Sequence, residues 1–250
     1  MTNCVLGIDI GGSGIKGAPV DLQTGTFAAG RLRIPTPAKS TPKRCAHVVA
    51  EIVHNFSDQI GDGPIGVTIP APSRHGVVPM MANLDKAWIG INANELFSEQ
   101  LNRPVVVVND ADAAGLAEVR YGAAQGHPGV VVMTTLGTGI GTALINDGDL
   151  VPNTELGHIE IDGHDAETRA SSAVRTRKDL SYKAWAKRLQ KYYRTLEKLL
   201  WPDLFVVGGG VSKNHDEFLP YISIDTPIVP AKLFNQAGIV GAAAFAAEHA

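Results

Sequence analysis

The chain has 250 residues, of which 44% are hydrophobic and 19% charged, so it can bury the core of one large domain or of two small ones. Its formal net charge is −3, from 22 Lys and Arg against 25 Asp and Glu, which argues against a protein that binds nucleic acid along its surface. Two cysteines, Cys4 and Cys45, are too few for a disulfide framework or a cysteine-rich metal site, and they favour a reducing cytoplasm.

The N-terminal segment M-T-N-C-V-L-G-I-D-I has no basic region, and Asp9 interrupts its apolar run, so a signal peptide is not expected. No apolar run approaches the roughly 18 residues that a membrane span needs. We therefore expect a cytoplasmic protein with neither a membrane nor a nucleic acid as partner.

Apolar runs predict strands and helical spacing predicts helices, and the two alternate along the chain. The first half is expected to hold strands at 5–10, 15–20, 27–34, 65–69 and 104–108, and helices at 45–56 and 92–101. The second half is expected to hold helices at 110–121, 181–200 and 236–249, and strands at 129–136, 141–145 and 204–207.

Each half opens with a strand, a glycine turn and a second strand. This repetition predicts two α/β domains of similar design, residues 1–109 and 110–250, with a cleft between them. The C-terminal helix, about 236–249, is able to pack back on the N-terminal domain.

The first glycine turn lies in D-I-G-G-S-G-I-K-G (9–17). It joins two strands and opens no helix, which excludes a dinucleotide fingerprint and a Walker A loop. Its backbone N–H groups can form an anion nest, although an ordinary hairpin turn is the alternative. The predicted phosphate contacts are Gly11, Gly12, Ser13, Gly14 and Lys16. Asp9 is placed to hold Mg²⁺ through water.

Two more glycine clusters follow strands, in T-L-G-T-G-I-G (135–141) and G-G-G-V-S (208–212). Three such loops converging on one cleft favour phosphate binding over turns alone. The phosphate contacts predicted from these two clusters are Gly137, Thr138, Gly139, Gly209 and Gly210.

The strand P-V-V-V-V-N-D (104–110) ends in Asn109 and Asp110, and a helix begins at once. Asp110 is either the helix N-cap or a general base that deprotonates an acceptor hydroxyl, with Asn109 bonding a neighbouring hydroxyl. In T-E-L-G-H (154–158), Glu155 and His158 suit either a sugar site or a structural histidine. Pro152 and Gly157 disfavour the helix that a metal site of this spacing would need.

Together these motifs resemble the ROK family of sugar kinases and repressors. The resemblance rests on D-I-G-G-S-G-I-K-G (9–17), N-D-A-D-A-A (109–114), T-L-G-T-G-I-G (135–141), V-V-G-G-G-V (206–211) and A-G-I-V-G-A-A (237–243). It implies an α/β, two-domain, actin-like ATPase (ribonuclease-H-like) fold, a homodimer and Asp110 as catalytic base. The implied sugar contacts are Asn83, Asn109, Asp110, Glu155 and His158.

The chain departs from the family pattern after the Gly-His pair. ROK proteins usually carry three cysteines there that join the histidine on zinc, whereas this chain has I-D-G-H-D-A-E-T-R-A-S (161–171). We therefore expect no zinc, and the resemblance carries the family's sugar-binding glutamate to Glu167. In a second departure, P-A-P (70–72) stands where the family often has Pro-Gly.

The missing cysteines and E-L-G-H-I-E (155–160) resemble the polyphosphate glucokinase branch of the family. That branch implies transfer of a phosphoryl group from inorganic polyphosphate, and sometimes ATP, to the 6-hydroxyl of glucose, with Mg²⁺ as cofactor and mannose open as a second acceptor. A strictly ATP-dependent glucokinase and a non-catalytic sugar-sensing protein are the alternatives. A repressor is disfavoured because the first phosphate strand begins at residue 4, which leaves no room for a helix-turn-helix ahead of it.

Positive charge is concentrated at residues 169–198, which hold ten Lys or Arg and two acids. The net charge of that segment is +8. Because the whole chain has a net charge of −3, the remaining residues have a net charge of −11. Within the predicted helix, Trp185, Leu189, Tyr192, Leu196 and Leu199 form the expected core face. Roughly opposite them lie Lys183, Lys187, Lys191, Arg194 and Lys198. This stripe, about 20 Å long at 1.5 Å per residue, suits a polyphosphate chain, and a solvated helix surface is the alternative.

Overall fold

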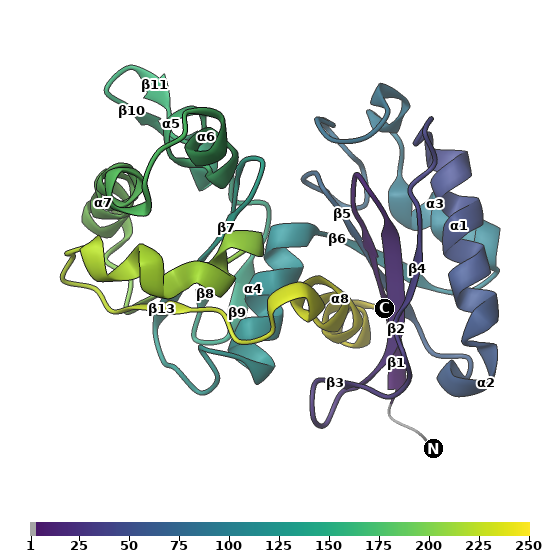
Figure 1. Cartoon of the computed structure of the whole chain (residues 1–250). Coiled ribbons are helices and arrows are strands. Elements are labelled where there is room, and N and C mark those ends of the chain that lie inside the picture. The colour runs from purple at the N-terminus through teal and green to yellow at the C-terminus, as the bar shows by residue number, and fades with distance from the viewer. Residues whose placement is uncertain (1–3) are drawn as a thin grey trace. The chain divides into compact units, whose positions relative to one another are not determined.

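The computed structural model describes residues 4–250, so the first three residues of the N-terminal segment lie outside the description. The chain divides into two units (Figure 1). Unit 1 runs up to Ala117 and takes in Gln236–Ala250, and unit 2 is Glu118–Asn235. The division falls inside helix α4 (Asp110–Tyr121) instead of after residue 109. The first turns of α4 stay with unit 1 because the carbonyl of Ala113 packs directly on Gly241 of the C-terminal helix.

Unit 1 is built on one mixed sheet. Its strands are β1 (Cys4–Ile10), β2 (Ile15–Asp21), β3 (Thr26–Phe27), β5 (Ile65–Ile69) and β6 (Val105–Asn109), in the order β3-β2-β1-β5-β6. β1 and β2 form an antiparallel hairpin, and β5 and β6 continue the sheet in parallel with β1. The single strand expected at 27–34 is wrong. Two short strands, β3 and β4 (Leu32–Ile34), pair separately with β2, and the run between them is broken at Gly30.

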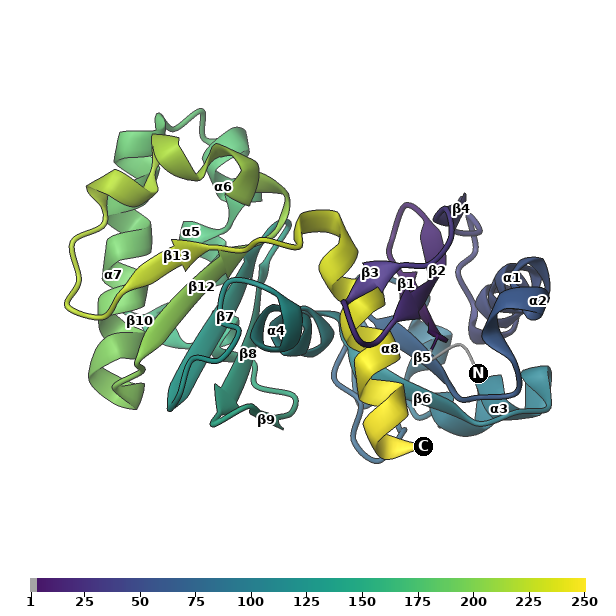
Figure 2. The ribbon, with the colours of Figure 1, turned by 90° about the horizontal axis from the view of Figure 1, so that it is seen from below.

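Helices cover both faces of the unit 1 sheet (Figures 1 and 2). One face carries α1 (Pro42–Asn55) and α3 (Ala93–Leu101), with the short α2 (Ser57–Ile60) and the 3-10 turn η1 (Lys86–Trp88) nearby. The other face carries α8 (Ala237–His249). α8 lies so close that a Cβ on Gly66 of β5 would stand 1.8 Å from the carbonyl oxygen of Ala242. Only glycine permits this approach.

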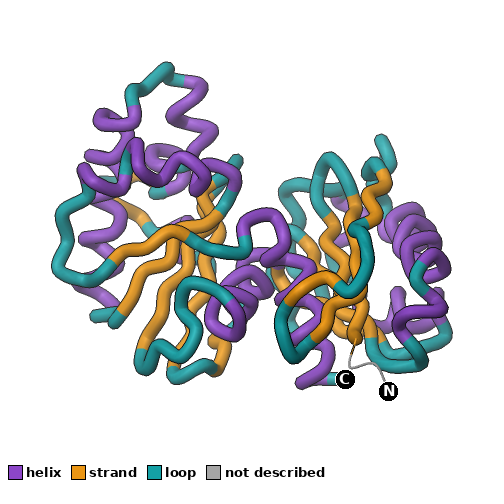
Figure 3. The backbone as a smooth tube through the Cα atoms, turned by 60° about the horizontal axis from the view of Figure 1, so that its bottom comes forward, coloured by secondary structure: helices purple, strands orange, loops and turns teal. Residues whose placement is uncertain are grey.

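Unit 2 repeats the same plan. Its sheet has the order β13-β12-β7-β8-β9, with an antiparallel hairpin, β7 and β8, extended in parallel by β12. Figure 3 shows the strands of each unit gathered in one layer. A separate two-stranded hairpin joins β10 to β11. The strand bounds are β7 (Val130–Leu136), β8 (Ile140–Asn146), β9 (Asp149–Val151), β10 (Glu160–Ile161), β11 (His164–Asp165), β12 (Leu204–Gly208) and β13 (Ile228–Pro230).

Helix α7 (Tyr182–Leu200) buries its apolar face in the core of unit 2. Trp185, Leu189 and Leu196 are fully buried against sheet residues such as Phe205. Leu199 was expected in this core and is 61% exposed, because the helix ends one residue later and Trp201 turns left-handed at its C-cap. The remaining helices are α5 (Glu167–Ala170), α6 (Ser172–Arg177), η2 (Leu156–His158), η3 (Gly210–Glu217), η4 (Leu219–Tyr221) and η5 (Phe234–Gln236). Within residues 4–250, no helix has the length and apolar character to cross a membrane.

Candidate active site

In unit 1, the carboxyl ends of the three parallel strands bring polar side chains to one edge of the sheet. The register aligns Asp9 of β1 with Thr68 of β5, and Ile69 of β5 with Asn109 of β6. The Lys16 ammonium donates to Asp9 Oδ2 at 3.1 Å, and the Thr68 hydroxyl donates to Asp9 Oδ1 at 2.9 Å. Ligands of open α/β sheets bind at this edge, so the predicted metal residue and the predicted phosphate cation lie together there.

At the end of β6, Asn109 and Asp110 have different environments. Asn109 is 8% exposed, and its side-chain oxygen accepts the N–H groups of Ala111 at 2.8 Å and Asp112 at 3.1 Å. Asn109 therefore caps α4, and the alternative in which Asp110 is the N-cap is wrong. Asp110 is the exposed first residue of the helix, beside the carboxyl edge of the sheet.

The first glycine turn is closed on itself and braced from outside. The Gly11 N–H donates to the Gly14 carbonyl at 3.1 Å, so one amide of the predicted anion nest is already engaged. Arg33 of β4 donates to the Ser13 carbonyl at 2.8 Å, and its guanidinium lies against Gly14. The backbone of the exposed Asn83 lies beside Gly12, where a Cβ would stand 3.6 Å from the Asn83 carbonyl oxygen.

Arg33 was not among the site residues predicted from the sequence. It pairs in register with Lys16 across β2 and β4, so two cations stand side by side next to the turn. The sequence signal was weak, because Arg33 is one of two arginines, with Arg31, in the strand expected at 27–34. Its position beside the turn follows from the pairing of β4 with β2.

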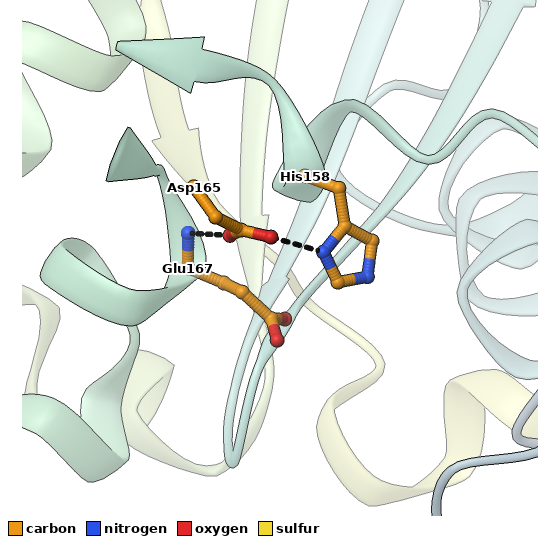
Figure 4. Close-up of side chains that lie close together, drawn as sticks. All are labelled: His158, Asp165 and Glu167. Atoms are coloured by element: carbon orange, nitrogen blue, oxygen red, sulfur yellow. Dashed lines mark hydrogen bonds and ion pairs between the residues drawn. The ribbon is translucent and has the colours of Figure 1, made fainter. Parts of the chain in front are cut away.

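In unit 2, the predicted sugar contacts His158 and Glu167 come together with a third residue, Asp165 (Figure 4). His158 Nδ1 lies 2.7 Å from Asp165 Oδ2, and the Glu167 N–H donates to Asp165 Oδ1 at 3.0 Å. Glu155 Oε2 is 3.8 Å from His158 Nε2, which is beyond hydrogen-bond length. Glu155 precedes the 3-10 turn η2 (Leu156–His158), and His158 is its last residue. This turn has three residues, so the segment does not form the longer helix that a metal site of this spacing would need.

Electrostatics raise two pKa values in this group. The hydrogen bond to Asp165 is the main cause that raises the pKa of His158; the charges of Glu167, Asp165 and Glu155 add to it, and burial opposes it. Burial raises the pKa of Glu155, with a further contribution from the charge of Glu167, while His158 opposes it. Glu155 and His158 therefore titrate in response to each other.

The second and third glycine clusters adjoin this group. The Ile140 N–H donates to Glu167 Oε2 at 3.0 Å, and a Cβ on Gly139 would stand 2.1 Å from the same oxygen. Gly209 has φ of +84° and packs on the Leu136 backbone, where a Cβ would stand 2.5 Å from the carbonyl oxygen. Unit 2 therefore places one predicted sugar carboxylate directly on a predicted phosphate loop, while Thr138 is exposed in that loop.

Among the predicted site residues and their described neighbours, a group in unit 2 and Asp9 in unit 1 carry oxygen or nitrogen atoms that can bind a cation. The donor atoms of His158, Asp165 and Glu167 lie within 4.8 Å of one another. In unit 1, the Asp9 carboxylate is a hard oxygen donor with 20% of its side chain exposed. Mg²⁺ usually keeps several waters and binds through one or two carboxylates and substrate phosphates, so the single carboxylate of Asp9 fits that ion.

The basic face of α7 forms a shallow groove of about 290 Å³. It is lined by Lys187, Gln190, Lys191, Arg194, Thr195 and Lys198. Lys191 also pairs with Asp162 of the β10–β11 turn, and Arg194 donates to the Ser223 carbonyl at 3.2 Å. Lys183 lies outside the groove lining, 5.6 Å from the Tyr221 ring centre. Four of the five predicted track residues thus line one surface.

The sequence of residues 5–174 matches the ROK family. The chain belongs to the ROK family. It is 50% identical to the polyphosphate glucokinase of Mycobacterium tuberculosis over 238 residues, which are 95% of this chain and 89% of that protein.

Solved structures of ROK proteins have the same fold. The polyphosphate/ATP-glucomannokinase of Arthrobacter sp. strain KM superposes with a TM-score of 0.93 and 52% identity, covering 99% of each chain. A ROK family glucokinase from Streptomyces griseus, in complex with glucose and AMPPNP, has a TM-score of 0.84 at 24% identity, covering 98% of this chain and 99% of that one. The α/β, actin-like ATPase fold predicted from the motifs is confirmed.

The residues predicted for one ROK active site are divided between the two units. Unit 1 carries Asp9, the first glycine turn with Lys16, Asn83, Asn109 and Asp110, and unit 2 carries Glu155, His158, Glu167 and the other two glycine clusters. Within each unit the predicted residues are neighbours. The structure adds Arg33 to the first group and Asp165 to the second.

Proposed function

We propose that this chain is a hexose kinase that transfers a phosphoryl group from inorganic polyphosphate to the 6-hydroxyl of glucose, with ATP as a second donor. The observation that carries the proposal is identity of about half over nearly the whole chain to two kinases of this type. These are the M. tuberculosis polyphosphate glucokinase and the Arthrobacter polyphosphate/ATP-glucomannokinase. The second of these names also supports mannose as an acceptor.

The acceptor side of the proposal rests on a group of hydrogen-bond acceptors. The carboxylates of Glu155 and Glu167 each lie close to the ring of His158 in unit 2, and hydroxyl groups of a sugar are donors that suit these acceptors. Asp110, exposed at the carboxyl edge of unit 1, is assigned as the general base that accepts the proton of the attacking hydroxyl.

The donor side rests on cations and amides. Lys16 and Arg33 lie beside the first glycine turn, and positive charge there stabilises the phosphoryl group during transfer. Asp9 would hold Mg²⁺, which neutralises phosphate charge when bound. Because Lys16 now pairs with Asp9, an arriving phosphate competes with Asp9 for the ammonium.

The basic groove on α7 supports polyphosphate as a donor. From Lys187 to Lys198 the helix rises about 16 Å, which is longer than the triphosphate of one ATP needs. A chain of phosphates at that spacing meets several of the cations that line the groove. A strictly ATP-dependent kinase has no use for the outer part of this surface.

The test is a panel of donors with glucose and mannose as acceptors. Long-chain polyphosphate, short polyphosphate and ATP are compared for formation of the 6-phosphate, with Asp110→Asn as the inactive reference and Glu99→Gln, an exposed carboxylate on α3, as the matched control. We expect activity with polyphosphate in the wild type and in the control. Activity with ATP alone would remove the polyphosphate part of the proposal, and no phosphorylation with any donor would remove the kinase assignment.

A further inference from the structure

Asp165 is the residue through which the predicted sugar contacts of unit 2 are connected. Its two carboxylate oxygens have separate partners: Oδ2 lies 2.7 Å from His158 Nδ1, and Oδ1 accepts the Glu167 N–H at 3.0 Å. The short hairpin of β10 and β11 carries Asp165 to this point, with the backbone pairing Asp165 to Glu160. Asp165 belongs to neither the predicted sugar contacts nor the predicted phosphate contacts.

We propose that Asp165 is a positioning residue that holds His158 with its proton on Nδ1, so that Nε2 is an acceptor for a sugar hydroxyl. The inference rests on the proposed sugar site. The chemistry follows from the hydrogen bond itself. An ionised carboxylate can only accept, so the proton in the 2.7 Å contact belongs to the histidine. A neutral ring with its proton on Nδ1 has a bare lone pair on Nε2.

The neighbours of Nε2 explain why this orientation needs support. Glu155 Oε2 is 3.8 Å from Nε2, and the Glu167 carboxylate lies beside the ring on the side that faces Asp165 (Figure 4). If the proton moved to Nε2, that atom would become a donor with Glu155 as an acceptor 3.8 Å away. A short rotation would then form an internal His158–Glu155 hydrogen bond and remove both groups from the sugar. Asp165 prevents this because it binds the proton on the opposite side of the ring.

The same oxygen that accepts from Glu167 fixes the start of α5. Glu167 is the first residue of that helix, and its side chain reaches the Ile140 N–H at 3.0 Å. Asp165 therefore anchors the backbone of one sugar contact and the ring of another. Glu155, His158 Nε2 and Glu167 are then all hydrogen-bond acceptors, and none of them is a donor. Such a set favours a ligand rich in hydroxyl donors.

The direct test is NMR of the imidazole nitrogens in the protein without sugar, at a pH high enough to deprotonate His158. The His158→Gln variant identifies the His158 signals. We expect the proton on Nδ1 in the wild type and its loss from Nδ1 in Asp165→Ala. Asp162→Asn is the matched control, since it alters a carboxylate of the same hairpin that pairs with Lys191 instead of His158. A wild-type proton on Nε2 would overturn the proposal, and so would a stoichiometric divalent metal on Nδ1.

Kinetics supply the second readout. Loss of a charge-assisted hydrogen bond should raise the KM for the sugar roughly tenfold or more in Asp165→Ala, while the KM for the phosphoryl donor stays near the wild-type value. Asp165→Asn retains one acceptor oxygen, so it should restore part of the sugar affinity even if the alanine variant folds poorly. An unchanged sugar KM in both variants would contradict the proposal.

The two measurements separate the possible failures. The NMR experiment needs no activity, so a protein that phosphorylates no sugar but keeps the Nδ1 proton refutes the proposed function alone. An active hexose kinase with the proton on Nε2 refutes the positioning role alone.

Discussion

At the scale of single residues, Asn109 and Asp110 show how neighbouring residues of one motif take different positions. Asn109 is the residue whose expected role changes most. Its side-chain oxygen caps α4, so that oxygen is engaged in stabilising the helix. Asp110, the next residue, then lies at the edge of the sheet. Asn109 is thus a buried helix cap and Asp110 is an exposed acid, a difference in environment that the sequence alone does not show.

The first prediction concerns Asp110. Asp110→Asn keeps the size of the side chain and removes the base, so kcat should fall about 10²- to 10⁴-fold, with a far smaller change in sugar affinity. Steady-state kinetics with glucose checks this, with Glu99→Gln as the control. A variant that retains more than about a tenth of the wild-type kcat contradicts the base assignment.

The second prediction concerns pH and His158. The pKa of His158 is raised in the folded state, chiefly by Asp165. Its contribution to stability is therefore complete below the unfolded value, about pH 6.5, and is lost as the pH rises through the folded pKa. The Tm of the wild type relative to His158→Gln should decline over that window. Asp165→Asn removes the main cause and should flatten the decline, whereas an equally steep decline in that variant would contradict the assignment.

At the scale of elements, α7 shows how one helix serves two purposes. Its apolar face fills the core of unit 2, and its opposite face carries the basic groove. The expected core face fails only at Leu199. Hydrophobic spacing gives the direction of a side chain, but it does not say where the covering sheet ends.

The third prediction tests the groove. Changing Lys187, Lys191 and Arg194 to Gln should raise the KM for long polyphosphate much more than the KM for ATP. Each lost phosphate contact also weakens the dependence on salt, by analogy with nucleic-acid phosphates. All three residues are exposed, so the Tm should hardly change.

The control is the same charge change on α1 and the loop before it, at Lys39, Lys43 and Arg44, which are also exposed. The control variant should leave the KM for polyphosphate and the KM for ATP near their wild-type values. An equal loss with polyphosphate and ATP in the groove variant, or no loss with either, would show that the groove is only a solvated surface.

The fourth prediction concerns the end of α4. Glu118 is fully buried, and its carboxylate accepts the N–H groups of Ala123, Lys232 and Leu233 at 2.7–3.1 Å. Glu118→Ala leaves these amides without their acceptor and should lower the free energy of unfolding by about 2–4 kcal/mol. Denaturant unfolding measures this, with the exposed Glu217→Ala as the control. Equal stability of the two variants would mean that water replaces the carboxylate at little cost.

At the scale of the whole molecule, the two units share one plan. The order β3-β2-β1-β5-β6 in unit 1 corresponds to β9-β8-β7-β12-β13 in unit 2. In both, a hairpin with a glycine turn is followed by parallel strands. Each unit places its chemistry on the loops at the strand ends, where the backbone is free of the sheet.

The fifth prediction concerns the metal content of the whole protein. The chain has two cysteines, Cys4 and Cys45, so it cannot supply the three thiolates that would complete a tetrahedral zinc site with His158. We expect activity to survive a zinc-selective chelator and to be lost when Mg²⁺ is withdrawn. Stoichiometric zinc in purified, untagged protein would contradict this prediction, and elemental analysis measures it.

Local patterns in the sequence were enough for most of the fold. Strands such as Ile65–Ile69 follow from short apolar runs, helices such as Asp110–Tyr121 follow from alanine-rich composition, and the glycine turns mark the hairpins. The motifs also identified the ROK family. These properties are local, since each depends on neighbours a few positions apart.

Only the tertiary structure decided which residues of different segments meet. Arg33 reaches the first glycine turn through pairing of β4 with β2, and Asp165 reaches His158 because a two-stranded hairpin folds back on η2. The capping of α4 by Asn109 and the exposure of Leu199 were likewise settled by packing. The physical reason is that a side chain's partner depends on strand register and on where a neighbouring element ends, and neither is written in the periodicity of one segment.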